Sequence, residues 1–177
     1  MRDSITETIS MSRSKGGVFH HPASVRCIGE YMDRTNSMGL WTYAKDYLDA
    51  GFAVATSVPR ALAPTPAYYL YCHAIELALK AYLRGTGASI TDLKRIGHDL
   101  TKAYKTALRI GLKDICELIP EQVEAIILVN PIYSKKEFEY IKVGAKTLPN
   151  INVLQGTAGS LIYAIKQFCY EKRNIHD

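Results

Sequence analysis

The sequence has few features of a secreted, disulfide-linked or membrane-spanning protein. No run approaches 18 consecutive apolar residues, and the N-terminus has no apolar signal segment. The cysteines form no CxxC pair and no Cys/His cluster at zinc spacing, so neither a disulfide scaffold nor a zinc site is expected. They are Cys27, Cys72, Cys116 and Cys169. We therefore expect a cytoplasmic protein with reduced thiols that does not span a membrane.

The motifs of several enzyme classes are also absent from the sequence. It contains no Gly-rich phosphate loop, no metal-binding triad and no nucleophile elbow, and no cofactor or metal site is expected. The composition is that of a globular protein, with 47% hydrophobic and 22% charged residues in a chain of 177. A net charge of +5 permits an anionic partner. We predict one helical domain over residues 37–177, preceded by a less ordered N-terminal extension over residues 1–36.

The most informative stretch runs from Thr65 to Gly87 and predicts a long helix. Thr65 and Pro66 suit the N-cap and first helical position, and Gly85 and Gly87 suit its end. About two-thirds of the helix circumference is apolar, so the helix should be buried among several neighbours, with Leu77 in the core. The rest forms one stripe of ionisable residues. These are His73, Glu76, Lys80 and Arg84.

Two interpretations of this stripe remain open from the sequence. It can be a solvated edge, on which Glu76 and Lys80 form an i,i+4 ion pair. It can also face a cleft or a partner, where burial would shift the pKa values of its members. We expect His98, in the turn after Gly97, to approach His73, Glu76 and Lys80, either tying two helices together or serving as part of a ligand site.

Apolar periodicity predicts further helices over residues 38–57, 99–112, 120–130 and 153–172. Ser89 and Asp92 form a capping box before a short helical turn that ends at Gly97. Residues 135–151 should be a structured loop or a short hairpin. The 99–112 helix is two-sided, and its charged row can contact nucleic acid or simply be its solvated face. That row comprises Lys102, Lys105, Arg109 and Lys113.

Three segments together resemble the HEPN superfamily. They are HAIELALKAYL (73–83), GHDL (97–100) and FEYIKVGAKTLP (138–149). The resemblance spans residues 38–172 and implies an all-α, up-and-down bundle of four to five helices that forms a homodimer. It also implies an RNA-directed role in toxin–antitoxin or defence systems, with RNA or a nucleotide as ligand. A cognate antitoxin or a nucleotidyltransferase is the implied genetic partner.

The sequence departs from the nuclease members of that superfamily, which use an Arg-x4–6-His motif. Only Arg13 and His20 have this spacing, and they fall in the extension. Where many members have Arg-Tyr in the loop, this chain has Glu139-Tyr140. The first hypothesis is therefore a non-catalytic module that binds RNA, a nucleotide or a protein partner. An atypical metal-independent endoribonuclease, with His98 as base and Lys80 or Arg84 as phosphate ligand, and a purely structural dimerisation module are the alternatives.

Overall fold

The computed structural model describes residues 35–57, 65–140 and 145–173. Within these ranges the chain forms six α-helices and one 3-10 helix and no strand, in agreement with the predicted all-α class. The count exceeds four to five because the short turn after Ser89 is a helix in its own right. The predicted extension falls mostly on residues 1–34, outside the described ranges. The elements are α2 (Ser37–Ser57), α3 (Thr65–Gly85), α4 (Ile90–Ile96), α5 (Leu100–Arg109), η1 (Leu112–Asp114), α6 (Pro120–Ser134) and α7 (Ile151–Glu171).

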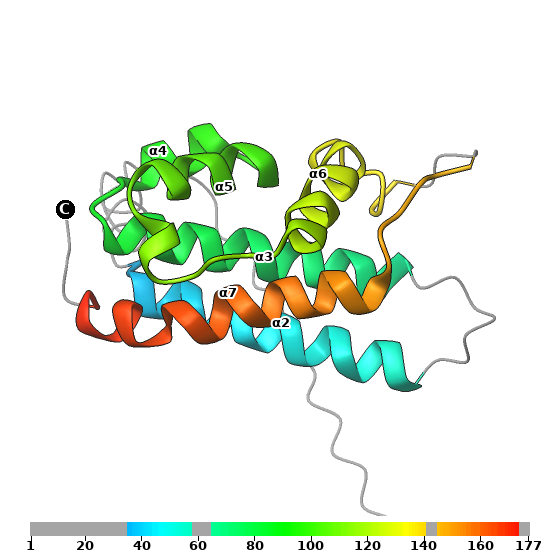
Figure 1. The fold of residues 1–177 in the computed structure, drawn as a ribbon, viewed down its shortest axis with the longest axis horizontal. Helices are drawn as coiled ribbons and strands as arrows, with labels where there is room; N and C mark the ends of the chain where they lie inside the picture. Colours follow the sequence, from blue (N-terminus) through cyan, green and yellow to red (C-terminus); the bar gives the residue numbers. More distant parts are fainter. Residues whose placement is uncertain (1–34, 58–64, 141–144, 174–177) are drawn as a thin grey trace, which may run out of the picture.

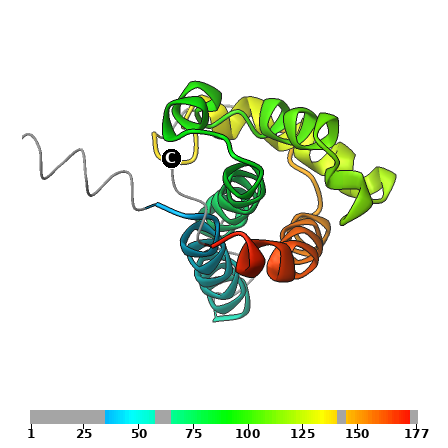
Figure 2. The same cartoon turned by 90° about the vertical axis from the view of Figure 1, so that its left-hand side faces the viewer.

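Helix α3 occupies the centre of the molecule. It packs lengthwise against α2 and α7, which also contact each other, while α4, α5 and α6 form a layer on its other side (Figures 1 and 2). Fourteen of its 21 residues are buried, as its largely apolar circumference predicts. Ile75, Leu79 and Leu83 are at most 1% exposed, and burying each side chain contributes about 1.5–3 kcal/mol. Leu77, expected in the core, is only partly buried and packs against its margin.

The predicted helix starts around α4 and α5 are present. The Ser89 hydroxyl accepts a hydrogen bond from the Asp92 amide at 3.1 Å, and the Asp92 carboxylate accepts one from the Ser89 amide at 3.2 Å. The Asp99 side chain caps α5 by accepting from the Lys102 amide at 2.9 Å. Helix α5 ends at Arg109, three residues earlier than expected, and the left-handed Gly111 (φ 99°) then leads into η1.

Helix α6 continues past the point where the sequence suggests an end. Asn130 and Pro131 were expected to stop it, yet it extends to Ser134 with Pro131 inside. An internal proline lacks the N–H of its turn and costs about 3 kcal/mol. The last turn offsets this cost because it buries Ile132 and Tyr133 against the rest of the protein. The sequence pattern indicates the local cost of the proline, but not the stabilisation that comes from burying the last turn of the helix.

The segment between α6 and α7 is irregular where it is described, and the hairpin alternative is not found in residues 135–140 and 145–150. It is nevertheless held against α3. The Tyr68 hydroxyl donates to the Pro149 carbonyl oxygen at 2.6 Å, and the Tyr68 ring stacks on Phe138 with centroids 6.2 Å apart. The prediction of a structured loop therefore agrees with the described part of this segment.

The described cysteines and the composition of the helices relate to the expected environment of the protein. Cys72, Cys116 and Cys169 are free and buried, as expected for thiols that act as small apolar side chains. Burial raises the pKa of the Cys169 thiol to about 12, which keeps it unreactive at neutral pH. None of the helices in the described ranges is long and apolar enough to cross a bilayer.

Candidate functional site

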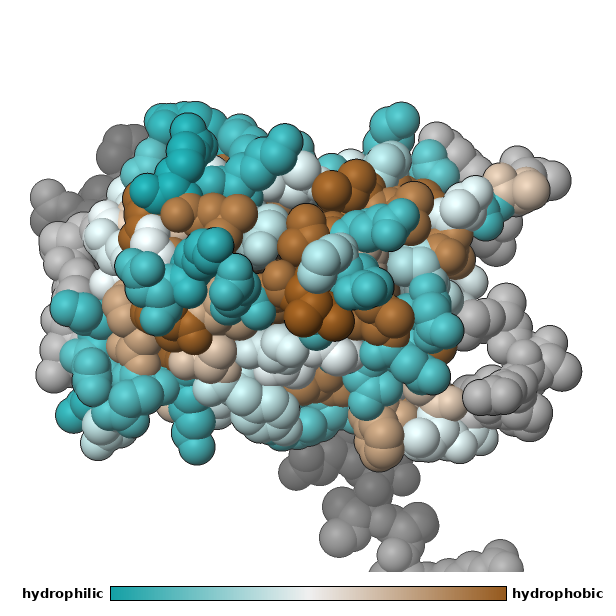
Figure 3. Space-filling model, viewed as in Figure 1, coloured by the Kyte–Doolittle hydropathy of each residue, from teal (hydrophilic) through white to brown (hydrophobic). Residues whose placement is uncertain are grey.

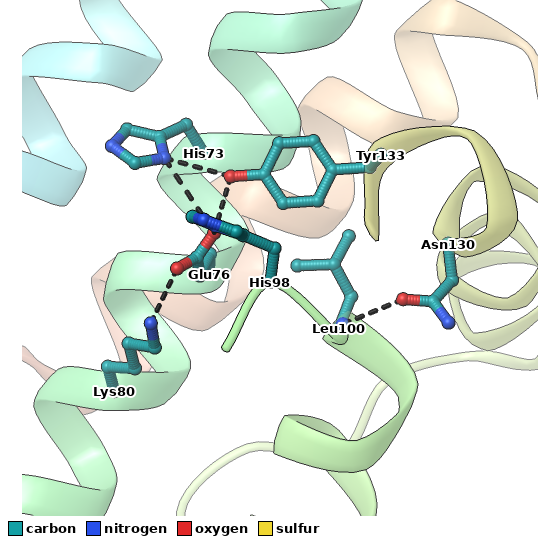
Figure 4. A network of polar contacts seen from close by, with 7 residues as sticks. All are labelled: His73, Glu76, Lys80, His98, Leu100, Asn130 and Tyr133. Atoms are coloured by element: carbon teal, nitrogen blue, oxygen red, sulfur yellow. Dashed lines mark hydrogen bonds and ion pairs between the residues drawn. The ribbon is translucent and has the colours of Figure 1, made fainter. Parts of the chain in front are cut away.

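A buried carboxylate on α3 is the centre of a polar cluster (Figure 4). The Glu76 side chain is 3% exposed, and both of its oxygens accept hydrogen bonds. Lys80 Nζ lies 2.6 Å from Oε1, while His98 Nδ1 lies 3.0 Å and the Tyr133 hydroxyl 2.5 Å from Oε2. His73 Nδ1 lies 2.8 Å from the Tyr133 hydroxyl and 3.8 Å from Oε2. We call these five residues, His73, Glu76, Lys80, His98 and Tyr133, the Glu76 cluster.

The hydrogen bonds of this cluster fix where its protons lie. An ionised carboxylate can only accept, so Tyr133 and His98 both donate to Glu76. Since the single phenol proton of Tyr133 is used in this way, His73 Nδ1 donates to the Tyr133 oxygen. Both imidazoles therefore carry a proton on Nδ1. In their neutral forms each presents Nε2 as an acceptor.

Electrostatics keep Glu76 ionised and Tyr133 protonated. Burial by itself raises the pKa of the Glu76 carboxyl, but the nearby imidazole N–H of His73, the charge and hydrogen bond of Lys80 and the hydrogen bond from Tyr133 together hold it well below its usual range. Burial and the nearby Glu76 charge raise the pKa of the Tyr133 phenol. At neutral pH the cluster thus contains a fixed negative charge, which the ammonium of Lys80 neutralises.

The two histidines differ in their surroundings. The His73 ring lies among tyrosines, with its centroid 4.4 Å from that of Tyr47 and 5.9 Å from that of Tyr69. The His98 side chain is 42% exposed, so its ring is the part of the cluster most open to solvent. The expected approach of His98 to the ionisable stripe is present. The interpretation of the stripe as a solvated edge is wrong at Glu76, which is almost completely buried.

Arg84 belongs to the same stripe in sequence but lies outside the cluster. It follows Glu76 by eight residues, which is about 12 Å along a helix. Its side chain is 1% exposed, and it donates from Nε to the Thr35 carbonyl oxygen at 3.0 Å and from Nη1 to the Ala88 carbonyl oxygen at 2.9 Å. These bonds tie the end of α3 to the chain segments beside it. Of the two predicted phosphate ligands, only Lys80 is part of the Glu76 cluster.

Asn130 on α6 is a second residue, besides Tyr133, that the sequence did not single out. Its Oδ1 accepts from the Leu100 amide at 2.7 Å (Figure 4), and its Nδ2 donates to Asp99 Oδ1 at 3.1 Å. Asn130 therefore holds the start of α5, immediately after His98, against α6. The one available signal was the i,i+3 spacing of Asn130 and Tyr133, which would share a helix face if the helix continued through Pro131.

The basic row of α5 borders a hollow between α5 and α6. Lys102, Lys105 and Arg109 are exposed and line a space of about 910 Å³ together with residues of α6 that include Ile127 and Asn130. Figure 3 shows hydrophilic side chains over α4 and α5 next to hydrophobic patches over α6. The fourth member, Lys113, does not line this hollow and pairs with Glu117 at 3.0 Å. The structure thus brings three of the four predicted basic residues to one concave surface.

Across the described ranges, no three His, Cys, Asp or Glu side chains are grouped so that they could hold a metal ion. The chemistry available at the site is that of two imidazoles, a phenol, an ammonium and a carboxylate, with a cationic surface close by.

No family model, no curated protein and no solved structure matches the chain.

Proposed function

We propose that this chain is a HEPN-like helical module of the cytoplasm that binds RNA along α5 without cleaving it. The observation that carries this proposal is the exposed row Lys102, Lys105 and Arg109 beside the α5–α6 hollow. Clustered positive charge on an accessible surface is what phosphate binding requires. The resemblance of residues 73–83 and 97–100 to the HEPN superfamily supports the same proposal.

A structural role for the Glu76 cluster fits this proposal. Both carboxylate oxygens of Glu76 already accept hydrogen bonds from groups within the protein. A general base must lie within hydrogen-bond reach of the substrate proton, and the carboxylate of Glu76, only 3% exposed, lies out of a substrate's reach. The cluster links three elements, namely α3, the turn that precedes α5, and helix α6. It thereby maintains the position of the basic row.

The test is RNA binding measured by fluorescence anisotropy of a labelled single strand between 50 and 200 mM salt. We expect the logarithm of the binding constant to fall linearly with the logarithm of salt concentration. A Lys105→Ala/Arg109→Ala double variant should reduce that slope by about 1.4, or about 0.7 for each lost phosphate contact. Lys113→Ala is the matched control, because Lys113 is paired with Glu117 away from the hollow. An unchanged slope in the double variant, or no binding at low salt, would contradict the proposal.

A metal-independent endoribonuclease is the second candidate, and the orientation of His98 favours it. Glu76 holds His98 Nδ1 at 3.0 Å, which leaves Nε2 as the acceptor on a ring that is 42% exposed. A carboxylate that orients an imidazole in this way is a common arrangement for a general base. Cleavage of labelled RNA in EDTA should be compared with thermal stability for His98→Ala and Glu76→Gln. Wild-type stability with lost cleavage would establish the nuclease, whereas a large loss of stability without cleavage by any form supports the structural role.

The partners implied by the resemblance stay predictions. A homodimer should give twice the monomer mass in light scattering at micromolar concentration, and monomer mass alone would contradict it. A gene for a small nucleotidyltransferase next to this one would favour the toxin–antitoxin context.

A further inference from the structure

Helix α5 forms a ridge between two hollows. The first, between α5 and α6, has an apolar wall made by Leu108, Ile127 and Pro131. The second, of about 620 Å³, lies between α5, α4 and the end of α3, and its apolar wall is made by Leu83, Ile96 and Ile110. Lys102 lines both hollows. The two concave surfaces are therefore neighbours that share one cationic side chain.

The charged side chains of this surface lie in different places from the apolar ones. The cations Lys102, Lys105 and Arg109 are exposed on α5 over about 10 Å of helix, and all three border the first hollow, while only Lys102 also borders the second. Two acidic side chains border the hollows: Asp92 is paired with Arg95 at 2.9 Å, and Asp99 accepts hydrogen bonds from the Lys102 amide and from Asn130. The ridge thus offers positive charge along the edge of the first hollow and apolar walls on both flanks.

This arrangement of charged and apolar side chains fits a single strand of RNA better than a duplex. In a duplex the bases are stacked and paired inside, so only phosphates and sugars could reach the ridge. A single strand can lay its phosphates along these cations and turn its bases into the hollows beside them. Half-exposed aliphatic side chains such as Ile127 (53%) and Ile110 (45%) would be covered by those bases.

We infer that α5 binds single-stranded RNA, with the phosphates on Lys102, Lys105 and Arg109 and unpaired bases in the hollows on both sides. The inference rests on the RNA binding proposed above and adds the form of RNA that is recognised. The walls contain aliphatic and no aromatic side chains in the residues that line these hollows. The bases are therefore held by general apolar contact, and little dependence on base sequence is expected.

The experiment compares binding of a labelled 12-nucleotide single strand with binding of the same sequence as a 12-base-pair duplex. Wild type should bind the single strand more tightly. Ile127→Gln and Ile110→Gln, one in each hollow, should each weaken single-strand binding about fivefold and leave duplex binding and the salt slope unchanged. Leu128→Gln is the matched control, because Leu128 is also an exposed aliphatic side chain of α6 (36%) but does not line either hollow.

The outcomes separate this inference from the function on which it rests. Equal affinity for strand and duplex, or single-strand binding by both Gln variants that equals wild type, would overturn the inference, even when the salt slope still depends on Lys105 and Arg109. Absence of any RNA binding at low salt would instead overturn the proposed function and the inference with it. A fivefold loss restricted to the single strand, with Leu128→Gln unaffected, supports the inference.

Discussion

Replacing Tyr133 by Phe would remove one oxygen from the centre of the Glu76 cluster and leave the ring in place. The hydroxyl donates to Glu76 Oε2 at 2.5 Å and accepts from His73 Nδ1 at 2.8 Å. Its loss would leave His98 as the remaining partner of Oε2 within the cluster, and His73 Nδ1 would lose its acceptor. The variant therefore tests whether this network stabilises the fold.

The size of the effect follows from the charge and burial of the partner. A hydrogen bond to a charged group contributes about 1.5–3 kcal/mol, and a buried donor left without an acceptor costs about 1 kcal/mol more. Glu76 is 3% exposed, so water cannot easily replace the lost donor. We expect Tyr133→Phe to lower the free energy of unfolding by about 3 kcal/mol.

The matched control is another buried tyrosine, Tyr71, which lies on α3. The Tyr71 hydroxyl is buried and has no hydrogen-bond partner among the residues that the structure describes. Removing a buried hydroxyl that makes no hydrogen bond costs nothing, so Tyr71→Phe should be neutral or slightly stabilising. The two variants delete the same atom from the same residue type and differ only in what that atom contacts.

Urea denaturation followed by circular dichroism measures both variants. With a denaturant slope of about 2 kcal/mol per molar, a loss of about 3 kcal/mol lowers the transition midpoint by roughly 1.5 M. A loss below about 1 kcal/mol for Tyr133→Phe, or an equal loss for Tyr71→Phe, would refute the reasoning.

Four further predictions concern Glu76, two glycines and Asn130. The pKa of Glu76 is lower in the folded protein than its unfolded value of about 4.3, so its contribution is complete above that pH and is lost as the pH falls below it. Glu76→Gln should therefore lose less stability than wild type between pH 5 and 3 in urea titrations. Gly51→Ala would place a Cβ 2.7 Å from the Tyr71 ring and should destabilise by about 1–3 kcal/mol. By contrast, Gly156→Ala meets nothing closer than 3.9 Å and should stabilise its helix by about 0.5–1 kcal/mol in thermal melts. Asn130→Ala should cost about 1–2 kcal/mol and speed hydrogen exchange of the first amides of α5.

Apart from the approach of His98 to Glu76, what the sequence could predict was local. The capping residues Ser89 and Asp99 act within three residues of themselves, and Glu76 meets Lys80 one turn away. The helix containing Glu76 was recognisable because its circumference is mostly apolar, whichever neighbours cover it. Such features are encoded where they act, and a single chain is enough to find them.

What it could not predict depends on distant contacts. Pro131 indicates a helix end, and the gain from burying Tyr133 arises only once α6 packs against α3. Arg84 has the spacing of a stripe residue, yet Thr35 and Ala88 supply carbonyl acceptors that bury it. Leu77 lies on an apolar face but at the margin of the core. In each case the deciding partner lies in another segment of the folded chain.

The order in which the partners of Glu76 leave the ribosome has a consequence for biogenesis. Lys80 follows within a turn, but His98 comes 22 residues and Tyr133 57 residues later. At 5–20 residues per second, the carboxylate waits about 3 to 11 s for its phenol donor. The last helix that covers α3, α7, is made later still. During that interval α3, which has more buried residues than any other described helix, stays incompletely covered on the nascent chain, where a chaperone that binds apolar segments would find a target.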